Sequence, residues 1–343
     1  MNNSTCFLQP SLATTVALPV IYSCLFPAGS FGNILAAWIF SRKALRRRTK
    51  YIYLANLVIA NLCVCSTMPF LAAYFAGGKH WSYESVECRI THYLGTLATH
   101  VCMYVTITIL CSIALSQYAA LKNSDTQYSP AVNENFSRCL LQAFRQPKFA
   151  TCLCTGIWLT VLCITVTVIT YDVQSRASKN VSSCYNIWVE AGEFTAMIAG
   201  SFATVCFFLS FMTVLWSYYS LTRHLNDIQR NTCIGEKHLI YSKVKRNVLV
   251  IQMILTVCFL PCHIFRPVFY VLLRHNDCPK LNYLVETKNL LTCLAATKSS
   301  LDPVITLLLD KTFKKSLYDL FTKSPPEHQK RDVVISTEMG RHM

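Results

Sequence analysis

Charged residues are scarce in this chain. Aspartate, glutamate, lysine and arginine make up 14% of its 343 residues, whereas 53% are hydrophobic. Soluble domains average about 25% charged residues, so the deficit argues for lipid as the main solvent. The first apolar segment, residues 16–40, exceeds the ~20 residues that span a bilayer. It has no basic flank before it and no small-residue cleavage site after it, which predicts an uncleaved anchor rather than a signal peptide.

The signatures of catalysis and of transport are also missing. The sequence holds no phosphate-binding loop, no zinc-ligand spacing and no nucleophile elbow, so it predicts no enzyme, no metal site and no cofactor. Internal repeats and paired broken helices are typical of many transporters. Neither pattern is present, which argues against a transporter or channel.

Positive charge is abundant but unevenly placed. The net charge of +15 could indicate nucleic-acid binding. With the N-terminus outside, however, the inner segments hold 23 Lys and Arg, the outer segments hold eight, and Lys298 lies within a span. This asymmetry is the positive-inside rule. It predicts an extracellular N-terminus and a cytoplasmic C-terminus, with the basic segments contacting anionic lipid and a cytosolic partner rather than nucleic acid.

Seven apolar runs organise the chain. They predict an all-α membrane protein, a seven-transmembrane helix bundle, with spans at residues 16–40, 51–76, 88–118, 149–171, 193–221, 248–273 and 281–309. Residues 311–321 are amphipathic with a basic face and predict a short eighth helix at the membrane surface. The predicted parts are therefore an extracellular N-terminus (1–15), the transmembrane domain (16–309) and the eighth helix with a cytoplasmic tail (310–343).

The sixth span carries the most informative stretch, Cys258 to Arg266. Pro261 removes a backbone donor and predicts a bend. His263 and Arg266 are three residues apart and share one helical face. An arginine at membrane depth usually faces a cavity or a partner, although the pair could instead extend toward the membrane surface.

Eighteen cysteines suggest a disulfide-rich protein, but most lie within spans, where cysteine acts as a small buried hydrophobe. Four fall on the outer side, where oxidation is possible: Cys6, Cys88, Cys184 and Cys278. Four cysteines allow three pairings. Glycosylation sequons at Asn2, Asn3 and Asn180 require the same location.

Several motifs carry a resemblance to a known family. The pattern C-F-x-P-x-H-x-x-R, the Gly32-Asn33 pair, Trp158 and Asp302-Pro303 together resemble rhodopsin-like (class A) G-protein-coupled receptors over residues 16–322. The purinergic-like branch, whose members bind nucleotides, nucleotide sugars or lysolipids, fits best. The resemblance implies a plasma-membrane receptor with a heterotrimeric G protein as partner, an anionic small-molecule ligand, and the disulfides Cys88–Cys184 and Cys6–Cys278.

The resemblance also implies a basic ligand site between the sixth and seventh spans. His263, Arg266 and Lys288 are the predicted contacts, and His100 in the third span is a further candidate. Arginine and lysine suit phosphate or carboxylate. Two alternatives stay open: Glu286 could neutralise Lys288, and His100 could be a buried, hydrogen-bonded histidine without a ligand.

The inner motifs depart from the family pattern. Ser116-Gln117-Tyr118 stands where the family has D-R-Y, and Thr306 replaces a tyrosine after Asp302-Pro303. Cys88 precedes Gln117 by 29 residues, about one helical turn more than usual. The resemblance also assigns switch roles to Tyr218, Phe259 and Pro261. Weak coupling, raised basal activity and a non-signalling decoy or scaffold are all compatible with these changes.

Lys298 is the least expected residue. It lies inside the seventh span, four residues before Asp302, so both face one side of the helix. A lysine at this depth must be paired or deprotonated. The family often binds sodium here through an acid of the second helix, where this chain has Asn61. We hypothesise that the Lys298 ammonium replaces the ion and pairs with Asp302; alternatively, Lys298 contributes only packing at a helix interface.

Overall fold

The computed structural model describes most of the chain. The described residues are 8–42, 48–77, 80–82, 84–91, 95–125, 142–176, 184–185, 190, 194–231, 235–273 and 278–322. They fall into two units, residues 1–303 and 304–343.

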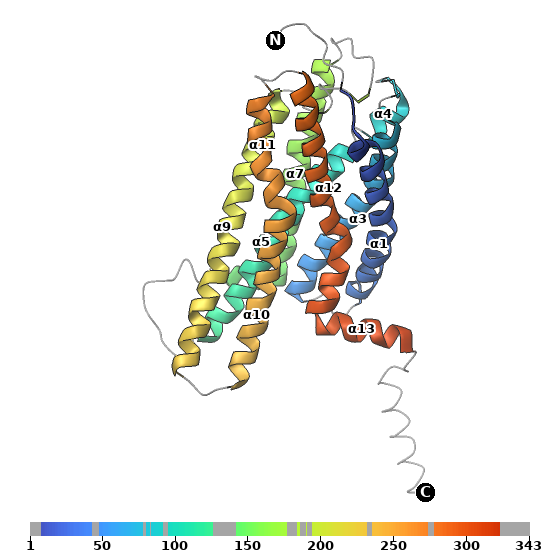
Figure 1. The fold of residues 1–343 in the computed structure, drawn as a ribbon. Coiled ribbons are helices and arrows are strands. Elements are labelled where there is room, and N and C mark those ends of the chain that lie inside the picture. The colour runs from blue at the N-terminus through green and yellow to red at the C-terminus, as the bar shows by residue number, and fades with distance from the viewer. Residues whose placement is uncertain are drawn as a thin grey trace, which may run out of the picture. The chain divides into compact units, whose positions relative to one another are not determined.

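Helices make up the first unit (Figure 1). A π-helical turn, η1 (Ala13–Ala17), leads into α1. The helices are α1 (Leu18–Phe40), α3 (Thr49–Gly77), α4 (Val86–Ile90), α5 (Thr96–Asp125), α7 (Pro147–Arg176), α9 (Phe194–Asn231), α10 (Gly235–Ile254), η3 (Leu255–Phe259), α11 (Leu260–Leu272) and α12 (Cys278–Leu309). Because α10, η3 and α11 follow one another without a break, they form one span. The described chain therefore has the predicted set of spanning helices. We call the end that holds α4 and Cys278 the N-terminal face, and the other end the opposite face.

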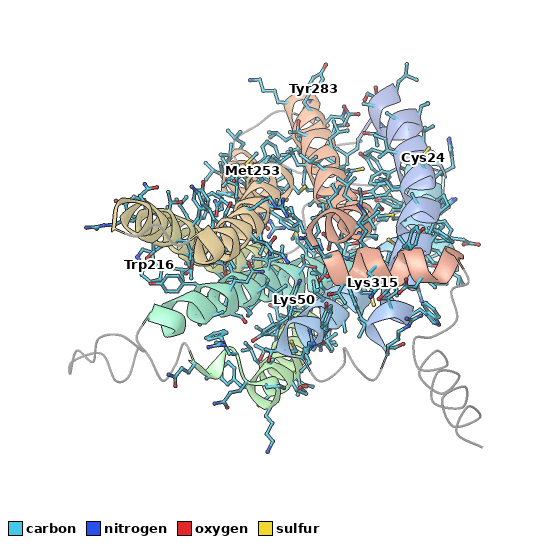
Figure 2. The ribbon with its side chains drawn as sticks, turned by 90° about the horizontal axis from the view of Figure 1, so that it is seen from below. Cys24, Lys50, Trp216, Met253, Tyr283 and Lys315 are labelled. Atoms are coloured by element: carbon cyan, nitrogen blue, oxygen red, sulfur yellow. A yellow bond between two sulfur atoms is a disulfide. The ribbon has the colours of Figure 1, made fainter. Side chains whose placement is uncertain are left out.

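Six of these helices are long and apolar enough to cross a membrane. The long helix outside that set is α12, which carries Lys298 and Asp302 in its C-terminal half. Large apolar side chains remain exposed along the bundle, as expected where lipid replaces water. Met253 and Trp216 are 53% and 54% exposed, and both are labelled in Figure 2.

At Pro261, where the sequence predicts a bend, the structure shows a change in hydrogen bonding. The turn η3 immediately precedes α11, and Pro261 occupies the first turn of α11. Leu260 donates its backbone N–H to the carbonyl of Leu255, five residues earlier. Since proline lacks an N–H, a wider turn lets the helix continue past it with fewer unsatisfied carbonyls.

Two glycines allow α1 to approach α12 closely. A Cβ at Gly29 would lie 2.5 Å from Ser300 Oγ, and one at Gly32 would lie 2.8 Å from Pro303 Cβ. No real side chain tolerates such contacts, so only glycine fits without moving α1 away from α12. This close approach brings Asn33 next to the polar groups of α12.

The third span was predicted to begin at Cys88, and Cys88 is helical in the structure. Cys88 lies in the short helix α4, whereas the long helix α5 begins at Thr96. The Ser85 hydroxyl accepts a hydrogen bond from Cys88 N and caps α4. Between these two helices, Thr91 and Gly95 are also helical, and residues 92–94 lie outside the described residues.

The second unit contains the last residues of α12 and the helix α13 (Lys311–Thr322). Asp310 caps α13, because its Oδ1 accepts hydrogen bonds from the backbone N–H groups of Thr312 and Phe313. Phe313 is buried, whereas Lys314 and Lys315 are exposed. The predicted amphipathic eighth helix is therefore present.

Candidate functional site

A cavity of about 450 Å³ lies inside the first unit. It falls in the range of small-molecule sites, ~300–1,000 Å³. Most of its lining residues are apolar or aromatic. The polar exceptions include three of the predicted ligand contacts, His100, Arg266 and Lys288.

Arg266 is the one lining cation whose described contacts include no carboxylate. Its guanidinium donates a hydrogen bond to the Tyr104 hydroxyl and lies 5.9 Å from the centroid of that ring. No ion pair of Arg266 occurs among the described residues. A charged group in an apolar cavity is costly unless an anion neutralises it, so Arg266 is suited to bind one.

His263 does not line the cavity, in contrast to the prediction. The side chain is fully buried and stacks on Phe207, with ring centroids 4.0 Å apart. Its Nδ1 lies 2.8 Å from the Phe259 carbonyl, so Nδ1 carries the proton and donates. His263 and Arg266 are three residues apart on α11, as the sequence shows, but Phe207 of α9 covers the imidazole. Residue spacing within one helix does not show which side chains of other helices pack against it.

Lys288 reaches the cavity but is already neutralised. Its Nζ lies 2.7 Å from Glu190 Oε2 and 2.6 Å from the Glu190 carbonyl. The Tyr74 hydroxyl donates to the other carboxylate oxygen at 2.6 Å. We call Tyr74, Glu190 and Lys288 the Glu190 latch. Sequence reasoning missed Glu190, because nothing in the sequence around it indicates which helix its side chain contacts.

Glu286, the predicted alternative partner of Lys288, binds the N-terminal segment instead. Its Oε1 accepts hydrogen bonds from Ser11 N and from the Thr14 hydroxyl. Gln9 and Asn282 exchange two further hydrogen bonds, 2.9 and 2.7 Å long. The segment before α1 is therefore fastened along the first turns of α12.

The Glu190 latch predicts a pH dependence. Burial acts to raise the pKa of Glu190, but the Lys288 ammonium and the hydrogen bonds from Lys288 and Tyr74 hold that pKa below its ordinary value of 4.5. A depressed pKa gives stability that is present above the unfolded-state pKa and is lost as the pH falls through the folded-state value. We expect wild type to be more stable than Glu190→Gln at pH 7, and to remain so down to pH 4.5.

Thermal unfolding of both proteins across this pH range measures the difference. Glu87→Gln is the matched control, because Glu87 is exposed on α4. The difference should disappear only below pH 4.5. Its disappearance above that pH would mean that burial outweighs the Lys288 ammonium.

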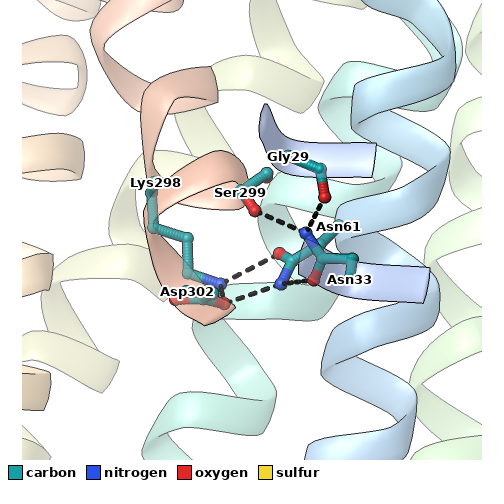
Figure 3. A network of polar contacts seen from close by, with 6 residues as sticks. All are labelled: Gly29, Asn33, Asn61, Lys298, Ser299 and Asp302. Atoms are coloured by element: carbon teal, nitrogen blue, oxygen red, sulfur yellow. Dashed lines mark hydrogen bonds and ion pairs between the residues drawn. The ribbon is translucent and has the colours of Figure 1, made fainter. Parts of the chain in front are cut away.

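A second polar cluster lies deep in the bundle (Figure 3). Lys298 forms an ion pair with Asp302, and its Nζ also donates to Asn61 Oδ1 at 3.2 Å. Asn61 Nδ2 donates to Asp302 Oδ2 at 2.8 Å and to Asn33 Oδ1 at 3.1 Å. Asn33 Nδ2 donates to the carbonyls of Gly29 and Ser299, both at 2.8 Å. The hypothesised pairing of Lys298 with Asp302 is present.

This cluster is almost sealed from solvent. Lys298 and Asp302 are 1% and 6% exposed, and both asparagines are fully buried. A buried charge is tolerated only when it is paired and hydrogen-bonded. Both conditions hold, because each charged group has the other and an amide of Asn61. The cluster joins α1, α3 and α12 through polar contacts.

The predicted coupling residues lie toward the opposite face. Tyr118 is buried; its hydroxyl lies 3.2 Å from Ser220 Oγ, and its ring contacts Trp216 edge-on at 5.2 Å. Gln117 Oε1 is buried without a hydrogen-bond donor in the described part of the chain. Ser116 is partly buried beside it. Lys245 lies 5.9 Å from the centroid of the Tyr218 ring.

The disulfide Cys88–Cys184 is present, as predicted. It fixes the segment of Cys184 to α4, and Cys184 N also donates to the Trp81 carbonyl at 3.0 Å. Cys278 is disulfide-bonded as well. Its predicted partner Cys6 lies outside the described residues, as do the sequons at Asn2, Asn3 and Asn180.

Comparison with known proteins agrees with this architecture. Residues 32–305 match the family described as "7 transmembrane receptor (rhodopsin family)". The chain is 50% identical to "Probable G-protein coupled receptor 82" of Homo sapiens, over 96% of this chain and 98% of that protein. It is 26% identical to "Probable G-protein coupled receptor 34" of Pan troglodytes, over 93% and 79%. A further relative, "Uracil nucleotide/cysteinyl leukotriene receptor" of Homo sapiens, is 24% identical over 86% and 75%.

The family match covers most of the chain, including every cavity-lining residue except Tyr22, the buried ion pair and Asp302-Pro303. The more distant relatives are of the purinergic-like kind that the motifs predicted. The family consists of signalling receptors rather than enzymes. The chain therefore belongs to the rhodopsin family of seven-transmembrane receptors.

Proposed function

We propose that the chain is a cell-surface receptor that binds an anionic ligand in its cavity and signals to a heterotrimeric G protein. The observation that carries the proposal is Arg266, a partly buried cation on the cavity wall with no carboxylate partner among the described residues. An arginine fork binds carboxylate or phosphate with two parallel hydrogen bonds. The relative that is named for uracil nucleotides and cysteinyl leukotrienes also has anionic ligands.

The proposed orientation has the N-terminal face outside the cell. The excess of Lys and Arg in segments at the opposite face supports it. The disulfide Cys88–Cys184 lies at the N-terminal face and would form on the oxidising side of the membrane. The cavity would then lie in the outer half of the bundle, and Gln117 and Tyr118 would lie toward the cytosol.

The test is a screen of anionic ligands against wild type and Arg266→Gln. Loss of a charge-assisted hydrogen bond costs ~1.5–3 kcal/mol, so we expect affinity to fall roughly 10- to 150-fold. Arg89→Gln is the matched control, because Arg89 is exposed on α4. Saturable binding of an anion that survives both Arg266→Gln and Lys288→Met would contradict the proposed site.

A second candidate, a non-signalling decoy or scaffold, is favoured by one observation. Gln117 stands where the family has arginine, and its Oε1 is buried without a donor in the described residues. We expect Gln117→Arg to raise G-protein activation above wild type at equal surface expression. Activation across a panel of G proteins measures the change. If both proteins stay silent with a saturating ligand, the scaffold function is supported instead.

We also propose that the Lys298 ammonium takes the place of a bound, exchangeable cation. It already sits between Asp302 and Asn61, the positions through which the family often holds sodium. Because this cation is covalently attached to α12, it cannot dissociate into solvent as a bound ion can, and it remains beside the carboxylate of Asp302.

A further inference from the structure

The interface between α3 and α5 contains a pair of thiols. Cys63 of α3 and Cys102 of α5 belong to different spans, and their thiols are hydrogen-bonded to each other. The thiol of Cys65, by contrast, is hydrogen-bonded to Ser300. Two thiols in contact can be oxidised to a disulfide, whereas a thiol beside a hydroxyl group has no second sulfur to join.

The register of the two helices also places these thiols opposite each other. Consecutive spans run antiparallel, so one turn toward the N-terminal face is four residues forward in α3 and three residues back in α5. One turn from Cys63 and Cys102, the hydroxyl oxygens of Thr67 and Thr99 lie 3.5 Å apart, and both threonines are buried. A disulfide requires Cα atoms ~4.4–6.8 Å apart, a separation that two helices reach only where short side chains meet, as they do here.

The two thiols differ in their access to the surroundings. Cys63 is partly exposed near the middle of α3, and Ile59 and Ser66, one turn to either side, are exposed on the same face. In a membrane this face contacts hydrocarbon, so a solute dissolved in the bilayer can reach Cys63. Cys102 is 2% exposed and lies behind Cys63. An oxidant therefore reacts first with Cys63.

We propose that Cys63 and Cys102 form a redox modification site, which a hydroperoxide converts into a disulfide between α3 and α5. A lipid hydroperoxide reaches the site from the bilayer and hydrogen peroxide reaches it from water, and both carry the same reactive O–O bond. Neither cysteine lines the cavity, so the site is separate from the ligand site proposed above.

The reaction takes two steps. The Cys63 sulfur attacks the terminal oxygen of the hydroperoxide, the O–O bond breaks, and the thiol proton passes to the departing alkoxide, which leaves a sulfenic acid and an alcohol. The Cys102 sulfur then attacks the Cys63 sulfur, the S–O bond breaks, and the hydroxide leaves as water with the proton of the Cys102 thiol. The thiols lose two electrons in total, and the hydroperoxide gains them.

The disulfide would join two helices that carry different parts of the receptor. Asn61 of the buried polar cluster lies on α3, whereas Gln117 and Tyr118 lie on α5. A covalent bond between the helices prevents α5 from sliding along α3 and removes conformational entropy from the unfolded chain. We therefore expect the oxidised receptor to be more stable to heat than the reduced one.

The test uses the full-length receptor in lipid nanodiscs, treated with linoleic acid hydroperoxide or with hydrogen peroxide and compared with untreated protein. Mass spectrometry after digestion without reductant should find peptides joined through Cys63 and Cys102. The lipid hydroperoxide should act roughly tenfold faster at equal bulk concentration, because its apolar chain concentrates it in the bilayer. The oxidised receptor should unfold roughly 5 °C higher. A link formed only by hydrogen peroxide would assign the source to water, and no link with either oxidant would overturn the inference.

Variants separate the roles of the two thiols. In Cys102→Ala, the sulfenic acid of Cys63 has no second thiol to react with, so dimedone should capture it. In Cys63→Ala, the buried Cys102 should stay unmodified. Cys163→Ala is the control, because it removes an exposed cysteine of another span and should form the link as wild type does. The wild-type map needs no substitution, so Cys63 oxidised to sulfinic acid beside a free Cys102 thiol would overturn the inference even if a variant failed to fold.

Discussion

Replacing Lys298 by methionine should strongly destabilise the receptor. The substitution keeps the volume of the side chain but leaves the carboxylate of Asp302 buried without its cation. Removing one partner of a buried ion pair costs ~3–5 kcal/mol, because the remaining charge is uncompensated. Thermal unfolding of the detergent-solubilised protein and its level at the cell surface measure the effect. Lys280→Met is the matched control, since Lys280 is exposed on the same helix.

The double variant Lys298→Met/Asp302→Asn distinguishes a lost charge from lost packing. An asparagine at 302 has no charge to neutralise and still offers an oxygen to Asn61 Nδ2, which now donates to Asp302. The double variant should therefore recover most of the lost stability. Sodium should not change the stability or activity of wild type relative to choline at equal ionic strength. A clear sodium effect on wild type would contradict the replacement of an ion by Lys298.

Breaking the Cys88–Cys184 disulfide should have an effect of similar size. The bond links residues 96 apart in the sequence, and loss of a native disulfide typically costs ~2–5 kcal/mol. Cys184→Ser should also loosen the segment that carries Tyr185 and Glu190, so ligand binding should fall along with stability. Thermal unfolding and ligand binding of the same preparation measure both effects.

Two variants control that experiment. Cys24→Ser changes an exposed cysteine that has no disulfide and should behave as wild type. Cys88→Ser/Cys184→Ser should match the single variant, because the bond is already absent there. A double variant as stable as wild type would show that the hydrogen bonds of the segment, such as Cys184 N to the Trp81 carbonyl, suffice without the disulfide.

The fold was predictable because membrane spans are encoded locally. Long apolar runs predicted the spanning helices, and Pro261 marked the place where η3 gives way to α11. The change in helix type near α4 was not predictable, because the distance from Cys88 to Gln117 fixes only how many residues intervene. The π-helical turn η3 was likewise hidden, since the sequence shows that a carbonyl loses its donor but not how the turn responds.

The site was predictable where one helix decides the geometry. Lys298 and Asp302 are four residues apart on α12, so their pairing follows from helical spacing. Contacts between distant segments were not accessible in this way. His263 is covered by Phe207 of α9, and Lys288 is neutralised by Glu190 rather than by Glu286 of its own helix. Each of these contacts depends on which side chain from a distant part of the chain packs at that position.

The pairing of Lys298 with Asp302 on one helix has a consequence for the membrane potential. An elementary charge that crosses the full field gains or loses ~2.3 kcal/mol per 100 mV. A small ion bound to a lone carboxylate can leave and so move charge through the field. Here both charges belong to α12 and sum to zero, so any movement of the helix carries them together. The membrane potential therefore exerts almost no net force on the Lys298–Asp302 ion pair.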